Sequence, residues 1–381
     1  MGILSGERFV AVAVGAVSSL AEGALPTAML LRTVASGVTP TVREDAEGAP
    51  LLMGYVPTID AKLEGEDRAA AIADVALEEC AGALVRDLDH ARRDARARGG
   101  AMDDVRRAGL AVTFEGAADA LPGVSSPIGL RLGARLGRPI ARDASVTRPR
   151  ERPAPAAPFE VGPRKADGAR DSIALLSEAL GWLTTKQADV VFWGATHTDW
   201  ATPRLRALEA QSMLYRLTAL DAVIPGEGAA FLAWMTADRA ERAGLRALAE
   251  LRGTAVVSVD LDDPVDRLDG FARASRSAAP DDAEIGWILS DLTFEAQDQL
   301  EWEAMVARAG PRIAHPFLID NPCRRIGQLG CASTALYASS IAASWGASHV
   351  PSPSALVLGR GPGGRRSALW LTKGLGLTRG T

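Results

Sequence analysis

The sequence predicts an α/β protein in which buried strands alternate with amphipathic helices. Residues 9–17, "FVAVAVGAV", and 188–195, "ADVVFWGA", are continuous apolar runs, which are typical of strands covered on both faces. Residues 66–95 place Ala, Ile, Val and Leu at helical spacing behind an acidic first turn, which indicates a long helix. Because this alternation continues through both halves of the chain, we expect largely buried sheets covered by helices.

The other elements follow in the same rhythm. Residues 147–164, "TRPRERPAPAAPFEVGPR", are rich in proline and are expected to form a linker or a surface excursion without regular structure. Residues 354–373 are expected to form two strands around a glycine-rich turn. Further strands are expected at 109–116, 246–260 and 286–293, and further helices at 169–185, 295–310 and 326–346.

Composition and charge exclude several classes of function. The chain has 381 residues, of which 47% are hydrophobic and 23% charged, an ordinary globular profile that allows two domains or one two-part fold. The formal net charge is −5, and the arginine-rich residues 92–100 are few and interleaved with acid, so no nucleic-acid partner is expected. The apolar N-terminal run is shorter than the roughly 20 residues of a membrane helix, so no membrane span is expected.

Cysteine and histidine usage predicts neither a disulfide framework nor a metal site. The three cysteines and four histidines have no zinc-ligand spacing, and no cofactor is expected. A reducing, cytoplasmic location fits this usage.

Cys331 opens a helix after a glycine-rich turn, where the helix dipole favours a thiolate, so it is a candidate nucleophile or else a small packing residue. His197 follows a strand and is either a candidate base or a hydrogen-bonded structural group.

Residues 359–364, "GRGPGG", match the letters of a dinucleotide-binding loop. That loop must connect a strand to a helix whose N-terminus meets the pyrophosphate. The residues that follow, "RRSALWLTK", have the pattern of a strand. We therefore expect a strand–turn–strand here and no nucleotide.

Four segments, taken in order along the chain, carry a family resemblance. "ADVVFWGATH" (188–197) is similar to an Ala-Asp strand, and "VIPGEGAAFLAWM" (223–235) to a Gly-Glu-Gly-Ala-Ala segment that leads into a strand. "RRIGQLGCASTA" (324–335) is similar to an Ile-Gly-His-Thr-x-Gly-Ala-Ala turn, and "GRGPGGRRSALWL" (359–371) to a closing Gly-Phe-Gly-Gly strand pair. Together with "FVAVAVGAVSSLAEG" (9–23) and "RAAAIADVALEECAGAL" (68–84), which look like an opening strand and a first long helix, these segments make the chain resemble the β-ketoacyl synthase family of the thiolase superfamily over essentially its whole length.

The resemblance implies the fold and the assembly. A member of this superfamily has the thiolase fold, in which two duplicated βαβαβ-type halves stack as five layers, α-β-α-β-α. The two halves are expected at 1–243 and 244–381, with the Pro-rich excursion inside the first. The resemblance also implies a dimer, either of this chain or with an active ketosynthase, and an acyl carrier protein as a possible partner.

The resemblance places three substituted residues at the catalytic positions. The family's cysteine falls on Ala169, its first histidine on Asp291 with Thr293 after it, and its second histidine on Gln328. Alanine cannot carry an acyl group, a carboxylate repels an enolate unless it is protonated, and glutamine can donate a hydrogen bond but cannot shuttle a proton. The motif residues that remain are expected to be structural: Gly226, Glu227, Gly228, Gly361, Gly363 and Gly364.

The expected function is therefore that of a degenerate, chain-length-factor-like protein. It would be a non-condensing partner subunit in fatty-acid or polyketide-type biosynthesis. The alternative is an active acyltransferase or hydrolase on the same fold, with a centre recruited from Cys331, His197 or Asp291.

Overall fold

A computed structural model describes residues 6–115, 127–138, 158–168, 171–200, 202–216, 221–293, 295–309 and 312–374. The first half contributes strands β1 (Phe9–Ser18), β4 (Arg107–Glu115), β5 (Glu160–Asp167), β6 (Val190–Thr198) and β7 (Glu227–Thr236). The second contributes β8 (Ala249–Ser258), β9 (Ile285–Ser290), β10 (Ile313–Asp320), β11 (Ser354–Gly361) and β12 (Arg365–Lys373). These strands form one continuous sheet in the order β10-β9-β11-β12-β8-β1-β7-β6-β4-β5.

The strand order repeats about the centre of the sheet. In the first half, β1 is antiparallel to β7, β7 is antiparallel to β6, and β6, β4 and β5 run parallel. The second half has the same pattern. Strand β8 is antiparallel to β12, β12 is antiparallel to β11, and β11, β9 and β10 run parallel. The halves join where Phe9–Ala11 of β1 pairs with Ala249–Leu251 of β8. This repetition supports our proposal that the chain is a duplication with its boundary between residues 243 and 244.

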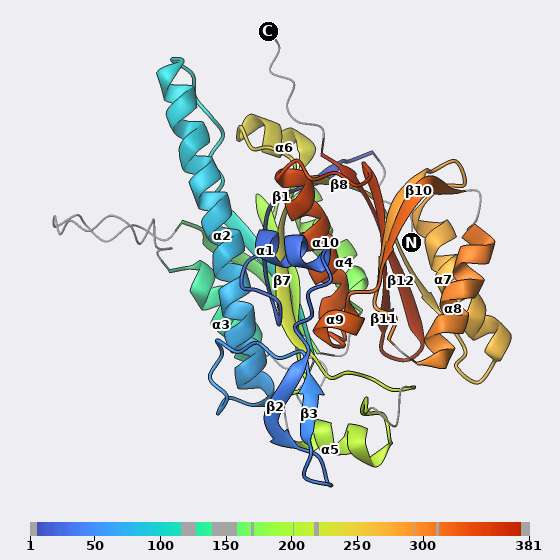
Figure 1. The fold of residues 1–381 in the computed structure, drawn as a ribbon. Helices are drawn as coiled ribbons and strands as arrows, with labels where there is room; N and C mark the ends of the chain where they lie inside the picture. The colour runs from blue at the N-terminus through green and yellow to red at the C-terminus, as the bar shows by residue number, and fades with distance from the viewer. Residues whose placement is uncertain are drawn as a thin grey trace.

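Helices complete a stack of five layers. Helices α2 (Gly65–Ala97) and α3 (Pro127–Leu136) cover the outer face of the first half, and α7 (Pro264–Ala278) and α8 (Ala296–Ala309) cover that of the second (Figure 1). Helices α4 (Ser172–Thr184) and α10 (Ala332–Gly346) lie between the two halves of the sheet. Residues 332–345 of α10 are all buried, which explains why that helix carries small and apolar residues all round. The predicted α-β-α-β-α architecture is confirmed.

The remaining elements lie at the edges of this stack. They are α1 (Ala24–Leu31), the hairpin of β2 (Thr39–Glu44) and β3 (Pro50–Met53), α5 (Thr202–Ala210), α6 (Ala237–Arg242) and α9 (Cys323–Ile326). Within the described ranges, no helix combines the length and the apolar character needed to cross a membrane.

The structure corrects the expectation for the Pro-rich segment. Residues 160–164 belong to β5, so the prediction that this stretch lacks regular structure is wrong there. Strand β5 ends the sheet, and the irregular register between Ala108 and Leu110 of β4 faces Gly162 and Pro163. A proline is tolerated in an edge strand at a bulge because no ladder hydrogen bond needs its missing N–H. Residues 147–157 lie outside the described residues.

Candidate functional site

A cavity of about 190 Å³ lies where β9, the β11–β12 turn, and the N-termini of α4 and α10 meet. Its lining includes Asp291, Gln328, Cys331 and Gly361, so the fold brings together four residues that the sequence singles out. Ala169 lies outside the described residues, but its neighbour Gly168 also lines the cavity.

Asp291 follows β9 and is 6% exposed. Its Oδ2 accepts the main-chain N–H of Arg360 at 2.8 Å. Its Oδ1 has no hydrogen-bond partner among the described residues. Burial raises the pKa of Asp291 to about 6, against the opposing charge of Arg360. At neutral pH this carboxyl is therefore largely ionised.

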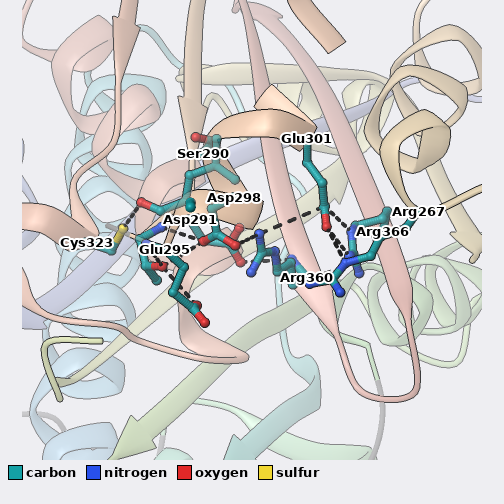
Figure 2. Close-up of polar contacts among 12 residues, drawn as sticks. Arg267, Ser290, Asp291, Glu295, Asp298, Glu301, Cys323, Arg360 and Arg366 are labelled. Carbon is teal, nitrogen blue, oxygen red and sulfur yellow. Dashed lines mark hydrogen bonds and ion pairs between the residues drawn. The ribbon is translucent and has the colours of Figure 1, made fainter. Parts of the chain in front are cut away.

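A buried ion network surrounds Asp291 (Figure 2). The Arg360 guanidinium pairs with Asp298 on α8, and Glu301, one turn further along α8, accepts two hydrogen bonds of 2.9 Å from Arg366. Burial by itself would lower the pKa of Arg360, but the charges of Asp298, Asp291 and Glu301 raise it. This network was not found from the sequence. Its signal in the sequence was two acids spaced i, i+3 on one helix, the second of them between Leu300 and Trp302.

Thr293 supports the network and does not line the cavity. Its N–H and its hydroxyl lie 2.7 and 2.8 Å from Oδ2 of Asp298, and the hydroxyl lies 3.0 Å from Glu295. Thr293 therefore fixes the turn between β9 and α8.

Gln328 is positioned by the glycine motif before β7. Its N–H donates to the carbonyl of Ile224 at 2.7 Å. A Cβ at Gly226 would lie 2.7 Å from the Gln328 carbonyl oxygen, so only glycine allows this approach. Gly228 is equally constrained, because a Cβ there would lie 2.8 Å from the carbonyl oxygen of Val17. Neighbouring backbone atoms lie too close to these two glycines for a larger residue to fit, which accounts for the structural role expected of them.

Glu227 forms a buried, bidentate ion pair with Arg68 of α2. The Arg68 Nη2 and Nε atoms lie 2.6 and 2.7 Å from the two carboxylate oxygens, and both side chains are fully buried. Thr198 at the end of β6 and the N–H of Val56 also donate to Glu227, at 2.7 and 2.6 Å. This pair fastens α2 and the loop after β3 to the central strands, and Arg68 was not singled out from the sequence.

The β11–β12 turn closes over the N-terminus of α4. Asp171 caps this helix by accepting the N–H groups of Ile173 and Ala174 at 2.9 and 3.1 Å. A Cβ at Gly361 would lie 2.7 Å from Oδ2 of Asp171. Burial raises the pKa of Asp171.

The turn itself is the strand–turn–strand that the sequence predicted. Gly363 and Gly364 have φ values of 66° and 75°, a region that favours glycine, and the strands on either side are antiparallel. A dinucleotide loop requires a helix after the glycines, so this interpretation is excluded by the fold.

His197 is the last residue but one of β6 and lies next to a carboxylate. It is 1% exposed, and its Nε2 lies 3.3 Å from Oδ2 of the buried Asp199. Asp199 also accepts from Arg204 at 3.1 Å and from the N–H of Gly226 at 3.2 Å. Although burial opposes it, the charges of His197 and Arg204 lower the pKa of Asp199. His197 is not among the residues that line the cavity.

Cys331 is the N-cap residue of α10 and is half-buried on the cavity wall. Its thiol donates to the carbonyl of Thr196, the residue before His197, at 3.4 Å. The other two cysteines, Cys80 and Cys323, are fully buried, and desolvation raises the pKa of both thiols. Within the described residues, no three His, Cys, Asp or Glu side chains are grouped as a metal site.

Comparison with known proteins identifies the fold. No family model and no curated protein matches the sequence. Among solved structures, a type II polyketide synthase acyl-carrier protein in complex with its ketosynthase bound to the hexaketide (AntDE:AntF) is similar, with a TM-score of 0.68 and 15% identity over 96% of this chain and 99% of that one. The chain has the thiolase fold.

Two further structures share this thiolase fold. The ishigamide ketosynthase/chain length factor has a TM-score of 0.61 and 20% identity, over 96% of this chain and 99% of that one. The ketosynthase from module 6 of the bacillaene synthase of Bacillus subtilis 168 has a TM-score of 0.67 and 11% identity, over 96% and 72%. The fold expected from the sequence motifs is confirmed.

Proposed function

We propose that this chain is a ketosynthase-like protein of polyketide biosynthesis that does not condense acyl units itself and acts as the partner subunit of an active ketosynthase. The observation that carries the proposal is the cavity that holds Asp291 and Gln328. These are the positions where the family resemblance places the two histidines, and neither residue supplies a neutral imidazole for proton transfer. Ala169, at the nucleophile position, has no atom that accepts an acyl group.

Strand β5 supports the pairing. Among the residues that the structure describes, it forms one end of the sheet, and all of its side chains are half-buried or exposed. An uncovered strand at the end of a sheet offers main-chain N–H and C=O groups to another chain. A ketosynthase subunit of the same fold would continue the sheet across this edge.

Co-expression tests the proposal. The chain is produced together with an active type II ketosynthase and an acyl carrier protein, and the mass of the purified complex is measured by light scattering. We expect a stable heterodimer whose condensing activity requires the cysteine of the partner and survives Cys331→Ser in this chain. A chain that stays monomeric and leaves the activity of the ketosynthase unchanged would refute the proposal.

A second function has a specific observation in its favour. Cys331 stands at the N-cap position of α10, lines the cavity, and donates to the carbonyl of the residue beside His197, which itself lies 3.3 Å from Asp199. These are the parts of a thiol nucleophile with a base and an orienting carboxylate. Incubation with an acyl thioester followed by mass spectrometry tests this acyltransferase or hydrolase. An acyl adduct on Cys331 that disappears in His197→Ala would favour it over the partner role, and an unmodified thiol would exclude it.

A further inference from the structure

Helix α1 is apolar on both of its faces. Its eight residues, "ALPTAMLL", carry no charge, and a helix that is apolar all round is ordinarily covered all round. Leu25 and Met29 lie one turn apart on one face and are 42% and 40% exposed. The opposite face packs on β1 and α10 (Figure 1) and consists of the buried residues Ala24, Thr27, Ala28 and Leu31. The face with Leu25 and Met29 is therefore an apolar surface that the described residues leave open.

Apolar and charged residues flank this surface at both ends of the helix. Leu20 lies before the helix and is half-buried, and Val34 lies after it and is 99% exposed. A charged residue stands between each of them and the helix, Glu22 at the start and Arg32 at the end, and both are exposed. Exposed apolar residues that gather in one patch mark an interaction surface. Together with the two exposed apolar residues of the helix, these four residues form the surface that we call the α1 patch.

The two charges of the α1 patch have no ion pair within the described part of the chain. The charged groups of α2 and α9 that contact α1 and the loop after it are already engaged. Glu79 of α2 accepts the N–H of Ala24 at 3.0 Å. Arg325 of α9 pairs with Asp320 at 2.6 Å and donates to the carbonyl of Thr33. The acid and the base of the patch therefore remain available to another molecule.

The order of its residues makes the α1 patch complementary to itself. Glu22 and Arg32 lie at equal distances along the chain on either side of Thr27, and so do Leu25 and Met29. When two identical helices pack antiparallel about a two-fold axis level with Thr27, each residue meets its counterpart in the second copy, and each contact occurs twice. Leu25 then packs on Met29 of the second copy, and Glu22 lies opposite Arg32 of the second copy. The outermost pair of the patch is spaced in the same way and is apolar.

We propose that the α1 patch is an interface between two copies of this chain, which pack α1 against α1 about a two-fold axis. This surface is separate from the edge of the sheet, because α1 packs on β1, and β7, β6 and β4 lie between β1 and β5. A ketosynthase bound along β5 would therefore leave α1 free, and two such heterodimers would join through α1 into an assembly of four chains. The inference goes beyond the proposed function and holds for the chain alone.

Charge reversal followed by mixing tests this interface in the full chain, with sedimentation velocity at rising protein concentration as the measurement. Because the patch is smaller than a standard interface, we expect a dissociation constant of about 10–100 µM for the unmodified chain. Glu22→Arg or Arg32→Glu alone places like charges opposite each other at two points, and each should weaken association at least about tenfold. An equimolar mixture of the two variants has opposite charges at both points, so it should associate as tightly as the unmodified chain.

Controls separate this interface from net charge, from β5 and from unfolding. Arg206→Glu on α5 changes the net charge as much as Arg32→Glu does, at another exposed arginine without an ion pair among the described residues, and it should leave association unchanged. Association through β5 is common to every sample and does not respond to these variants. Urea unfolding establishes that each variant is folded before it is mixed. Met29→Gln removes an apolar contact and no charge, and it should also weaken association; it replaces a charge variant that is unstable.

Three results would each overturn the proposal. They are an unmodified chain that does not associate, folded single variants that associate as tightly as the unmodified chain, and a mixture that associates no more tightly than its components.

Discussion

Asp291→Asn should stabilise the protein at alkaline pH. The pKa of Asp291 is about 6 in the folded chain, against 3.8 for an unperturbed aspartate. The folded state therefore binds the proton more tightly than the unfolded state, and ionisation of this carboxyl at higher pH destabilises the fold. The difference between the two pKa values corresponds to about 3 kcal/mol at pH 8, falling below about 1 kcal/mol at pH 4. Asparagine removes the charge but can still accept the N–H of Arg360.

Urea unfolding of both proteins at pH 8 and pH 4 measures this effect. The free energy of unfolding of Asp291→Asn should exceed that of the unmodified protein by up to about 3 kcal/mol at pH 8, and the excess should largely vanish at pH 4. Glu250→Gln is the matched control with the opposite sign, because hydrogen bonds from Arg8 lower the pKa of Glu250. It should destabilise at pH 8. An Asp291→Asn variant no more stable than the unmodified protein at pH 8 would refute the reasoning, because Asp291 would then not be desolvated.

Three further substitutions test the packing around the site, each measured by urea unfolding at pH 7. Arg68→Ala leaves Glu227 buried and uncompensated and should destabilise by about 3–5 kcal/mol, and a loss below about 1 kcal/mol would contradict the role given to this pair. Gly226→Ala places a Cβ 2.7 Å from the Gln328 carbonyl and should destabilise by about 1–3 kcal/mol, whereas a neutral result would mean that the two loops separate easily. Gly181→Ala in α4 meets no atom within 4 Å and should stabilise by up to about 1 kcal/mol through its higher helix propensity; a destabilised variant would indicate a contact that the structure lacks.

Local patterns in the sequence predicted most of the helices and strands, because the faces that an element buries determine how apolar residues are spaced along it. The continuous apolar run of β6 and the helical spacing of α2 both record which faces are covered. Strand β5 was missed for the opposite reason. Its proline density opposes a strand locally, and only its place at the end of the sheet, with a bulge opposite β4, makes the strand possible.

The residues of the candidate site also fall into two groups, those found from the sequence and those that needed the structure. Asp291 and Gln328 were found from the order of motifs along the chain, and Cys331 from its place at a helix start after a glycine-rich turn; the fold gathers all three around one cavity. Arg360 and Asp298 were not found, because they are 62 residues apart in the sequence and no local pattern links them.

The sequence by itself determined the alternation of strands and helices and the likeness to ketosynthases, and it led to our proposal that Ala169, Asp291 and Gln328 stand where condensation would need Cys and His. Only the tertiary structure decided the protonation and the pairing of the residues around the site. The protonation of Asp291, the engagement of Arg360 by Asp298 and the capping of α4 by Asp171 depend on burial and on charges from distant segments. Desolvation and electrostatic pairing are properties of three-dimensional surroundings, and a linear pattern does not carry them.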